Sequence, residues 1–230
     1  MDIRGILLDS GGTLVFPKGG SWWPGTEFHS ILRKHGVATS EISPQQMNTA
    51  LDTAEKYFTN RVISDLEEER QEFRGYYRVL CQNLGFVKAT DELIDDLACA
   101  YVDGCSLELY PDTVDTLDRL TKEGIFLGVL SDAWPSLETK YTRLGIRHYF
   151  RSFTLSARVG CFKPCDRIYH TAIAEIGIDK GSLLFVDDDL GDVGAAIRLG
   201  MKAAVILRDR EIVAGDIPVI RDLHGIFDLI

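Results

Sequence analysis

The sequence predicts an α/β protein: a parallel β-sheet with helices on both faces, interrupted near its start by an all-helical insert. From Tyr110 onward, short apolar runs alternate with helix-length segments, a pattern typical of parallel strands that are buried on both faces. One more apolar run, Ile6–Leu8, precedes them near the N-terminus. The long stretch between these two regions lacks strand-like alternation, so we expect it to form helices.

After Ile6–Leu8, the expected strands are Phe126–Leu130, a weaker run at Phe153–Leu155, Leu183–Val186 and Ala203–Leu207. The helices between them are expected at Thr113–Lys122, Ser136–Leu144, Arg167–Ile176 and Val193–Leu199. Right-handed crossovers would join such parallel strands. Ligands of these sheets bind beyond the carboxyl ends of the strands, so the polar residues that follow each run are the candidates for a site.

The insert is expected to hold helices at Glu27–His35, Pro44–Thr59, Leu66–Leu84 and Asp91–Asp103. Ser43 followed by Pro44 is a plausible helix cap with a first-turn proline, and Thr90 begins another helix. The sequence therefore predicts two domains: a core of residues 1–15 and 109–230, and a helical domain of residues 16–108. Trp22 and Trp23 open the insert; we expect them to pack between the domains, with a wall of a substrate pocket as the alternative.

Composition excludes some classes of partner. The net charge is −10 and the isoelectric point about 5.0, which disfavours binding to nucleic acids or anionic membranes. A phosphorylated small molecule stays compatible, because a bound cation can invert the local field. No run reaches the length of a membrane span and no leader precedes the first strand, so a cytoplasmic location is expected.

The five cysteines are scattered, and Cys161 and Cys165 form the single close pair in the sequence. An odd number of scattered cysteines suggests reduced thiols in a cytoplasm. A zinc site would need further ligands nearby, and none is visible. We expect ordinary packing for the pair, with a metal or redox role as the less favoured alternative.

Polar residues follow four of the predicted strands. Asp9 follows the first, Ser131 and Asp132 the second, Lys163 lies beyond the third, and the acidic run Asp187–Asp192 follows the fourth. A carboxylate, a hydroxyl, a cation and an acidic cluster at one edge of a sheet form a coherent site for an anionic substrate.

This ordered set resembles the four motifs of the haloacid dehalogenase superfamily. The first motif there is Asp-X-Asp-X-Thr, and here it reads Asp9-Ser-Gly11-Gly-Thr13. The resemblance implies a Rossmann-like core with a helical cap and a Mg2+-dependent hydrolase acting through an aspartyl intermediate on a small phosphorylated molecule. The residue roles that it implies are nucleophile (Asp9), metal ligands (Asp9, the Gly11 backbone carbonyl, Asp188 and Asp192), and catalytic or phosphate-binding groups (Lys163, Ser131 and Asp132).

Gly11 stands where phosphatases of this family carry their general acid/base, a group typically worth about 10²–10⁴-fold in rate. A phosphatase-type hydrolase is therefore our main hypothesis. A phosphonatase-like or other non-phosphatase hydrolase is the first alternative, and a degenerate member acting as a binding protein is the second. A phosphonatase would need a Schiff-base lysine from the insert, where the candidates are Lys18, Lys34, Lys56 and Lys88. The sequence leaves open the substrate, the oligomeric state, and which of Asp187, Asp189 and Asp192 assists Asp188.

Overall fold

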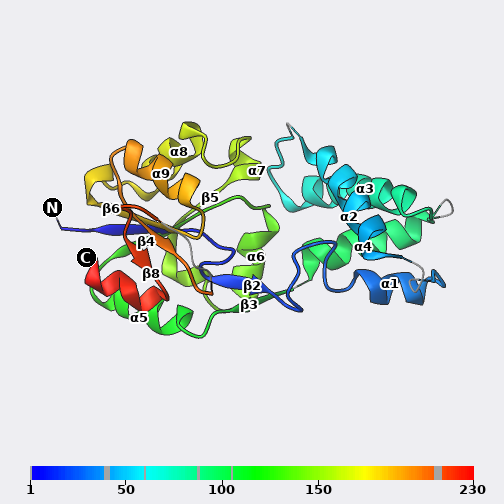
Figure 1. Cartoon of the computed structure of the whole chain (residues 1–230), viewed down its shortest axis with the longest axis horizontal. Coiled ribbons are helices and arrows are strands. Elements are labelled where there is room, and N and C mark those ends of the chain that lie inside the picture. The colour runs from blue at the N-terminus through cyan, green and yellow to red at the C-terminus, as the bar shows by residue number, and fades with distance from the viewer. Residues whose placement is uncertain (1, 39–41, 60, 87–88, 105, 210–213) are drawn as a thin grey trace. The chain divides into compact units, whose positions relative to one another are not determined.

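Strand β1 (Gly5–Leu8) lies in the middle of a six-stranded sheet in the computed structural model of the chain. The structure describes residues 2–38, 42–59, 61–86, 89–104, 106–209 and 214–230. The strands run in the order β5–β4–β1–β6–β7–β8, and neighbouring strands are parallel (Figure 1). The other strands are β4 (Phe126–Ser131), β5 (Phe150–Leu155), β6 (Leu183–Asp187), β7 (Lys202–Ile206) and β8 (Val219–Ile220). The predicted α/β class with a Rossmann-like parallel sheet is confirmed.

The predicted strands differ from the observed ones mainly at their ends and among the shortest elements. β5 begins at Phe150 rather than Phe153, and β7 ends at Ile206 rather than Leu207. The prediction missed β8 and a separate two-stranded sheet of β2 (Val15–Pro17) and β3 (Leu107–Leu109). Residues 16–108 are therefore not purely helical. Strands of two or three residues are too short to display an alternating pattern.

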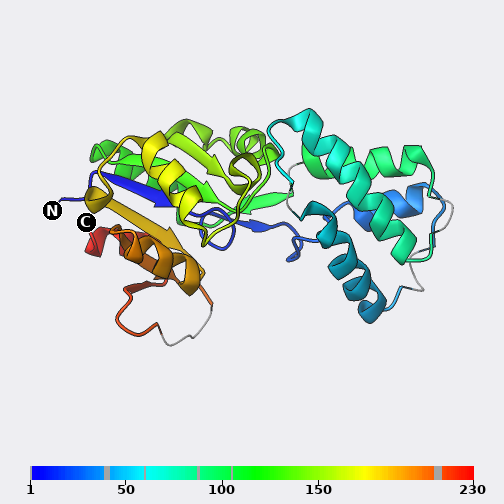
Figure 2. The ribbon, with the colours of Figure 1, turned by 90° about the horizontal axis from the view of Figure 1, so that it is seen from above.

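Two hydrophobic clusters cover the two faces of the six-stranded sheet. β1 alternates between them, because Ile6 and Leu8 belong to one cluster and Leu7 to the other. The first cluster includes residues of α5 (Thr113–Lys122), α6 (Ser136–Arg143) and the 3-10 helix η4 (Leu223–Asp228). The second includes α8 (Asp166–Ile176) and α9 (Leu190–Arg198). Figures 1 and 2 show these helices on opposite sides of the sheet.

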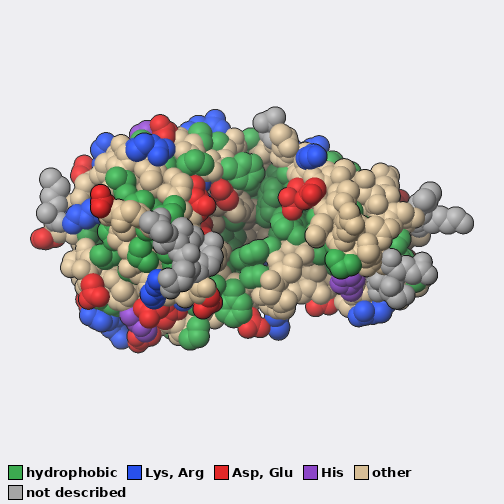
Figure 3. All heavy atoms as spheres, viewed as in Figure 1, with side chains coloured by type: hydrophobic (Ala, Val, Ile, Leu, Met, Phe, Trp, Pro, Cys, Tyr) green, Lys and Arg blue, Asp and Glu red, His purple; other side chains and the backbone are tan. Residues whose placement is uncertain are grey.

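Three short helical elements complete this part of the chain: η2 (Arg147–Tyr149), α7 (Ser156–Val159) and η3 (Lys180–Ser182). α9 begins three residues before the predicted start at Val193, because Asp189 caps it by accepting hydrogen bonds from the Gly191 and Asp192 amides. Figure 3 shows one face of the molecule, on which Asp and Glu side chains are interspersed with Lys and Arg.

The helices of the insert are α1 (Phe28–Lys34), α2 (Pro44–Glu55), α3 (Leu66–Asn83) and α4 (Asp91–Asp103), with the 3-10 turn η1 (Lys56–Phe58) after α2. Ser43 caps α2 in a reciprocal capping box with Gln46, as its position before Pro44 predicted. Thr90 caps α4 by accepting from the Leu93 amide. These helix starts follow from local sequence alone.

The described residues form two compact units. Unit 1 comprises Met1–Phe16 and Leu107–Ile230, and unit 2 comprises Pro17–Ser106. Trp23 packs inside unit 2, where its ring lies 5.1 Å from Tyr76 and 5.3 Å from Tyr101 between centroids, whereas Trp22 is exposed. That unit 2 acts as a cap remains a prediction. Among the described residues, no helix has the length and apolar character that a membrane-spanning helix requires.

Candidate active site

Parallel register brings Asp9 and Asp187 to the same level at the carboxyl edge of the sheet. Leu8 pairs with Val186 of β6, and the Asp9 amide donates to the Val186 carbonyl at 3.0 Å. The next residue on each strand is therefore a carboxylate, and both are almost fully buried. On the other side of β1, Leu8 pairs with Val129, which places the end of β4 at this edge as well.

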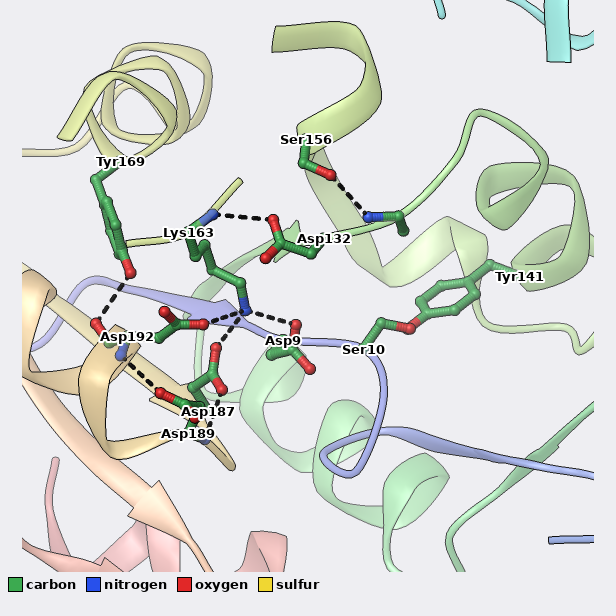
Figure 4. A network of polar contacts seen from close by, with 11 residues as sticks. Asp9, Ser10, Asp132, Tyr141, Ser156, Lys163, Tyr169, Asp187, Asp189 and Asp192 are labelled. Carbon is green, nitrogen blue, oxygen red and sulfur yellow. Dashed lines mark hydrogen bonds and ion pairs between the residues drawn. The ribbon is translucent and has the colours of Figure 1, made fainter. Parts of the chain in front are cut away.

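Lys163 reaches this edge from the loop between α7 and α8. Its Nζ lies 2.8 Å from Asp9 Oδ1, hydrogen-bonds to Asp187, and lies 3.4 Å from Asp192 Oδ2. The lysine side chain is 3 % exposed. Figure 4 shows the amine in the midst of these carboxylates. One buried ammonium group thus faces three carboxylates.

Asp188 adds a fourth carboxylate and lies against the turn that follows β1. A Cβ on Gly12, whose φ is 74°, would come within 2.5 Å of an Asp188 carboxylate oxygen. Asp9, Asp187 and Asp188 each offer an oxygen, and these oxygens lie within 4.8 Å of one another. Hard oxygen donors at this spacing suit Mg2+, and their surplus of negative charge favours a cation. The donor set therefore fits the metal that the sequence implied.

The residues brought together differ in part from the predicted ligand set of Asp9, Gly11, Asp188 and Asp192. Asp187 joins the group, whereas the Asp192 carboxylate lies beside the amine of Lys163. Gly11 is half-buried and forms a backbone bridge with Val15 in the turn beside Asp188. The roles of Gly11 and Asp192 as ligands stay predictions.

Burial shapes the titration of these groups. It raises the pKa of Asp187 well above its usual value, and the charge of Asp9 adds to this effect. Burial also raises the pKa of Asp192. Burial opposes the charged form of Lys163, but the charges of Asp9 and Asp187 outweigh it and hold the lysine pKa well above its usual value. Lys163 is therefore a permanent cation that part-compensates the carboxylates.

Ser131 and Asp132, the predicted phosphate-binding residues, lie where β4 ends. Ser131 is the last residue of the strand and is buried. The Asp132 carboxylate accepts the backbone N–H of Lys163 at 3.0 Å (Figure 4). Asp132 therefore anchors the loop that carries the lysine. The residue is exposed overall, yet protein atoms crowd its carboxyl group, and this desolvation raises its pKa to about 6.

Sequence reasoning missed two residues that support the turn after Asp9. Arg208, two residues after the end of β7, donates to the carbonyls of Gly12 (3.2 Å) and Thr13 (2.6 Å) and pairs with Asp112 at 3.1 Å. Tyr141 donates its hydroxyl hydrogen to Ser10 Oγ at 2.7 Å. The strand-end rule, applied to the last predicted strand, would have found Arg208, because this residue follows the apolar run Ala203–Leu207. No local signal identifies Tyr141.

Comparisons with known proteins identify the family of the chain. The sequence model of the haloacid dehalogenase-like hydrolases matches residues 3–200 of the chain. The chain belongs to the haloacid dehalogenase-like hydrolase family. The chain is thus a hydrolase of this family. That its site lies at the sheet edge indicated by the motifs stays a prediction.

Relatives of the chain include a phosphatase and a dehalogenase. The chain is 32 % identical to the glyceraldehyde 3-phosphate phosphatase of Methanopyrus kandleri, covering 90 % of this chain and 85 % of the relative. It is 31 % identical to the (S)-2-haloacid dehalogenase of Pseudomonas putida, covering 90 % and 86 %. The crystal structure of a HAD phosphatase from Thermococcus onnurineus has the same fold, with a TM-score of 0.67 and 21 % identity over 99 % of this chain and 97 % of the other.

Proposed function

We propose that this chain is a Mg2+-dependent phosphatase that acts on a small phosphorylated metabolite through an aspartyl-phosphate intermediate on Asp9. The observation that carries the proposal is the grouping of Asp9, Asp187 and Asp188, whose oxygens lie within 4.8 Å of one another. A site with this surplus of negative charge would repel an anionic substrate unless a cation occupied it. Bound Mg2+ would screen the substrate phosphate from these carboxylates and polarise it.

Each protein group then has a task that its position permits. The Asp9 carboxylate attacks phosphorus and displaces the leaving oxygen, and water later cleaves the acyl phosphate formed. Lys163 holds Asp9 through the 2.8 Å contact and offers its remaining positive charge to the phosphoryl oxygens. Ser131, buried at the end of β4, would donate a hydrogen bond to the same oxygens. The supporting contacts of Arg208 fix the turn that carries Gly11.

Gly11 restricts the substrates that such a site turns over well. No side chain at this position can protonate a leaving alcohol, which removes a contribution of about 10²–10⁴-fold. Substrates whose leaving groups need no proton, such as acyl or aryl phosphates, lose least. We therefore propose a preference for phosphorylated metabolites with good leaving groups.

Hydrolysis of a 2-haloacid is the second candidate function. It is favoured by the missing carboxylate at Gly11, since a halide leaves without a proton, and by the dehalogenase relative from Pseudomonas putida. The Asp188 carboxylate beside the nucleophile counts against it, because it adds negative charge where the carboxylate of a haloacid would bind. A phosphonatase has weaker support, because it would need a Schiff-base lysine from the insert. Of the candidate lysines there, Lys34 pairs with Asp96 at 2.9 Å, and Lys88 lies outside the described residues.

The test is a turnover screen with acyl, aryl and alkyl phosphates, a phosphonate and 2-chloropropionate, each in Mg2+ and in a chelator. We expect phosphate release that requires Mg2+ and is lost, by roughly 10⁴-fold or more, in Asp9→Asn. Asp166→Asn, which removes an exposed carboxylate of α8, is the charge-matched control and should retain turnover. Halide release that persists in the chelator, without phosphate release, would overturn the proposal in favour of the second candidate.

The substitution Gly11→Asp tests the role of the missing acid. It should raise turnover of alkyl phosphates more than that of acyl phosphates, with a ceiling of about 10²–10⁴-fold, because only alkoxide leaving groups need a proton. The positive φ in this turn belongs to Gly12 (74°). The backbone conformation that disfavours side chains therefore lies one residue after the substituted position 11. Equal gains for both substrate types, in a variant that binds Mg2+ like wild type, would contradict the acid/base explanation.

A further inference from the structure

Two thiols flank Lys163 in the loop between α7 and α8. Cys161 is half-buried and Cys165, at the start of α8, is exposed. Both are free thiols. Cys161 packs against the second hydrophobic cluster, as expected for ordinary apolar packing, whereas Cys165 is exposed and lies outside both clusters.

The loop folds so that the two thiols meet. A turn closed by the hydrogen bond from the Cys165 amide to the Phe162 carbonyl (3.0 Å) brings the ends of the segment together. The Cys161 thiol lies close enough to Cys165 to lower the pKa of the Cys165 thiol. Arg167 donates from Nε to the Cys161 sulfur at 3.4 Å and from Nη2 to the Gly160 carbonyl at 2.7 Å. Arg167 thus lies against both thiols, with its guanidinium group on Cys161 and its backbone N–H on Cys165.

The same surroundings favour a thiolate at Cys165. The backbone N–H of Arg167 in the first turn of α8 and the Cys161 thiol both lower the pKa of Cys165, and the Arg167 charge adds to this effect. A thiolate, not a thiol, is the nucleophile that reacts with peroxides and disulfides. Cys165 is also the more exposed of the two, so a small oxidant can reach it.

We propose that Cys161 and Cys165 are a redox modification site, which hydrogen peroxide converts reversibly into an intramolecular disulfide spanning Lys163. The Cys165 thiolate attacks one peroxide oxygen, the O–O bond breaks, and a sulfenic acid and hydroxide form. Cys161 then attacks the Cys165 sulfur, the S–O bond breaks, and water leaves as the S–S bond forms. In balance, two thiols lose two electrons and two protons, and one peroxide becomes two waters.

The disulfide would act on the candidate site through Lys163. An S–S bond is about 2.05 Å long, shorter than any contact between two thiols, so forming it must draw the ends of the segment closer. Lys163, between them, is fixed at its backbone by Asp132 (3.0 Å) and at its amine by Asp9 (2.8 Å). We therefore infer that oxidation loosens these contacts and that reduction restores them.

Peptide mapping of the full chain after peroxide treatment tests the modification. We expect a peptide that links Cys161 to Cys165, lost again with dithiothreitol. Cys99→Ser, which removes a half-buried thiol of α4, is the matched control and should form the same link. In Cys161→Ser, dimedone should trap a sulfenic acid on Cys165 several-fold faster than it traps Cys161 in Cys165→Ser. No linked peptide in wild type, or links that join either residue to other cysteines instead, would overturn the proposal.

Amide hydrogen exchange tests the coupling to Lys163 without any assay of activity. Oxidised protein should exchange faster than reduced protein in the segment 160–166, and unchanged exchange despite a mapped disulfide would overturn the coupling. A second readout rests on the proposed function: oxidation should lower phosphate release by roughly 10²-fold, reversibly, in wild type but not in Cys165→Ser. A chain with the disulfide and faster exchange that releases no phosphate even when reduced would refute the proposed function and leave this inference standing.

Discussion

The sheet edge of unit 1 and the centre of unit 2 bury different kinds of side chain. At the sheet edge of unit 1, Lys163, Asp9 and Asp187 have side chains that are 8 % exposed or less, and carboxylates outnumber the amine. At the centre of unit 2, Phe73 stacks on Tyr101 with ring centroids 4.2 Å apart, and Tyr76 lies fully buried beside it. The aromatic contacts stabilise unit 2. In unit 1, burial of the charged groups at the sheet edge lowers the folding stability that the apolar sheet provides.

The ion pairs of the units differ in the same way. Three arginines of α3, spaced four residues apart, pair with three aspartates of α4 at 2.5–2.7 Å (Arg70–Asp103, Arg74–Asp95 and Arg78–Asp91). These pairs are partly exposed, so each contributes little to stability. Removing one partner of the buried pairs of Lys163 would cost much more folding stability, because a lone buried charge would remain. Pairs of a basic residue with an aspartate are therefore surface contacts in unit 2, whereas in unit 1 they form the buried centre of the candidate site.

The substitution Lys163→Met should break this contrast most strongly. In the absence of a cation it should destabilise unit 1 by about 3–5 kcal/mol, because Asp9 and Asp187 lose their shared counter-charge. Mg2+ should raise the melting temperature of the variant by more than that of wild type, since the cation replaces the missing charge. Thermal unfolding with and without Mg2+ measures both effects, and exposed Lys122→Met is the control. Equal Mg2+ effects in wild type and variant would contradict the carboxylate group as a cation site.

The substitution Phe73→Ala should cost a similar amount in unit 2 by a different mechanism. Removing this fully buried ring leaves a cavity among Tyr76, Tyr101 and Phe58, which typically costs about 3–5 kcal/mol. No metal ligand is involved, so the response to Mg2+ should equal that of wild type. Denaturant unfolding followed by tryptophan fluorescence measures the loss, with exposed Val62→Ala as the control. A Mg2+ response altered by Phe73→Ala would show that the two units are energetically coupled.

The substitution Asp132→Asn should change how stability depends on pH. The pKa of Asp132 rises from 3.8 to about 6 on folding, so the folded chain binds this proton more tightly than the unfolded chain. The free energy of unfolding contributed by Asp132 therefore falls as pH rises from about 4 to about 6. Solvent screens part of this penalty because the residue is exposed, and we expect about 1 kcal/mol.

In Asp132→Asn this pH-dependent loss should be absent. The stability difference between variant and wild type should therefore grow in favour of the variant across that window. Urea titrations at several pH values measure the difference, with Asp166→Asn as the matched exposed carboxylate. A difference that is flat with pH would count against the raised pKa.

The substitution Thr90→Ala should have the smallest effect, because it removes a local signal rather than a tertiary contact. Thr90 accepts a hydrogen bond from the Leu93 amide at 3.2 Å, and loss of such a cap costs about 1 kcal/mol. Thr49→Ala, at an exposed position within α2, is the matched control and should stay within about 0.5 kcal/mol of wild type. Equal stability of the two variants would argue that the caps of unit 2 are redundant.

The sequence sufficed for most of the fold because its strongest signals are local. Continuous apolar runs marked the larger strands, and Ser43 and Thr90 marked helix starts through hydrogen bonds to amides three residues ahead. The elements it missed, β2, β3 and β8, are too short to carry a periodic pattern. Their backbone pairs are supplied by residues distant in the chain, such as Val205 beside Val219.

For the candidate site, the sequence by itself determined which residue types stand at the strand ends, because a buried strand and the polar residue that follows it are neighbours in the chain. Asp9 and Ser131 were found in this way, whereas Lys163, which lies beyond α7, and Asp188 were singled out by their resemblance to the family motifs. Only the tertiary structure decided which carboxylates face which groups. Parallel register places Asp187 beside Asp9, loop geometry directs Lys163 between them, and Arg208 reaches back across 196 residues to Gly12. Such contacts depend on angles and distances set by the packed sheet, and no short stretch of sequence encodes them.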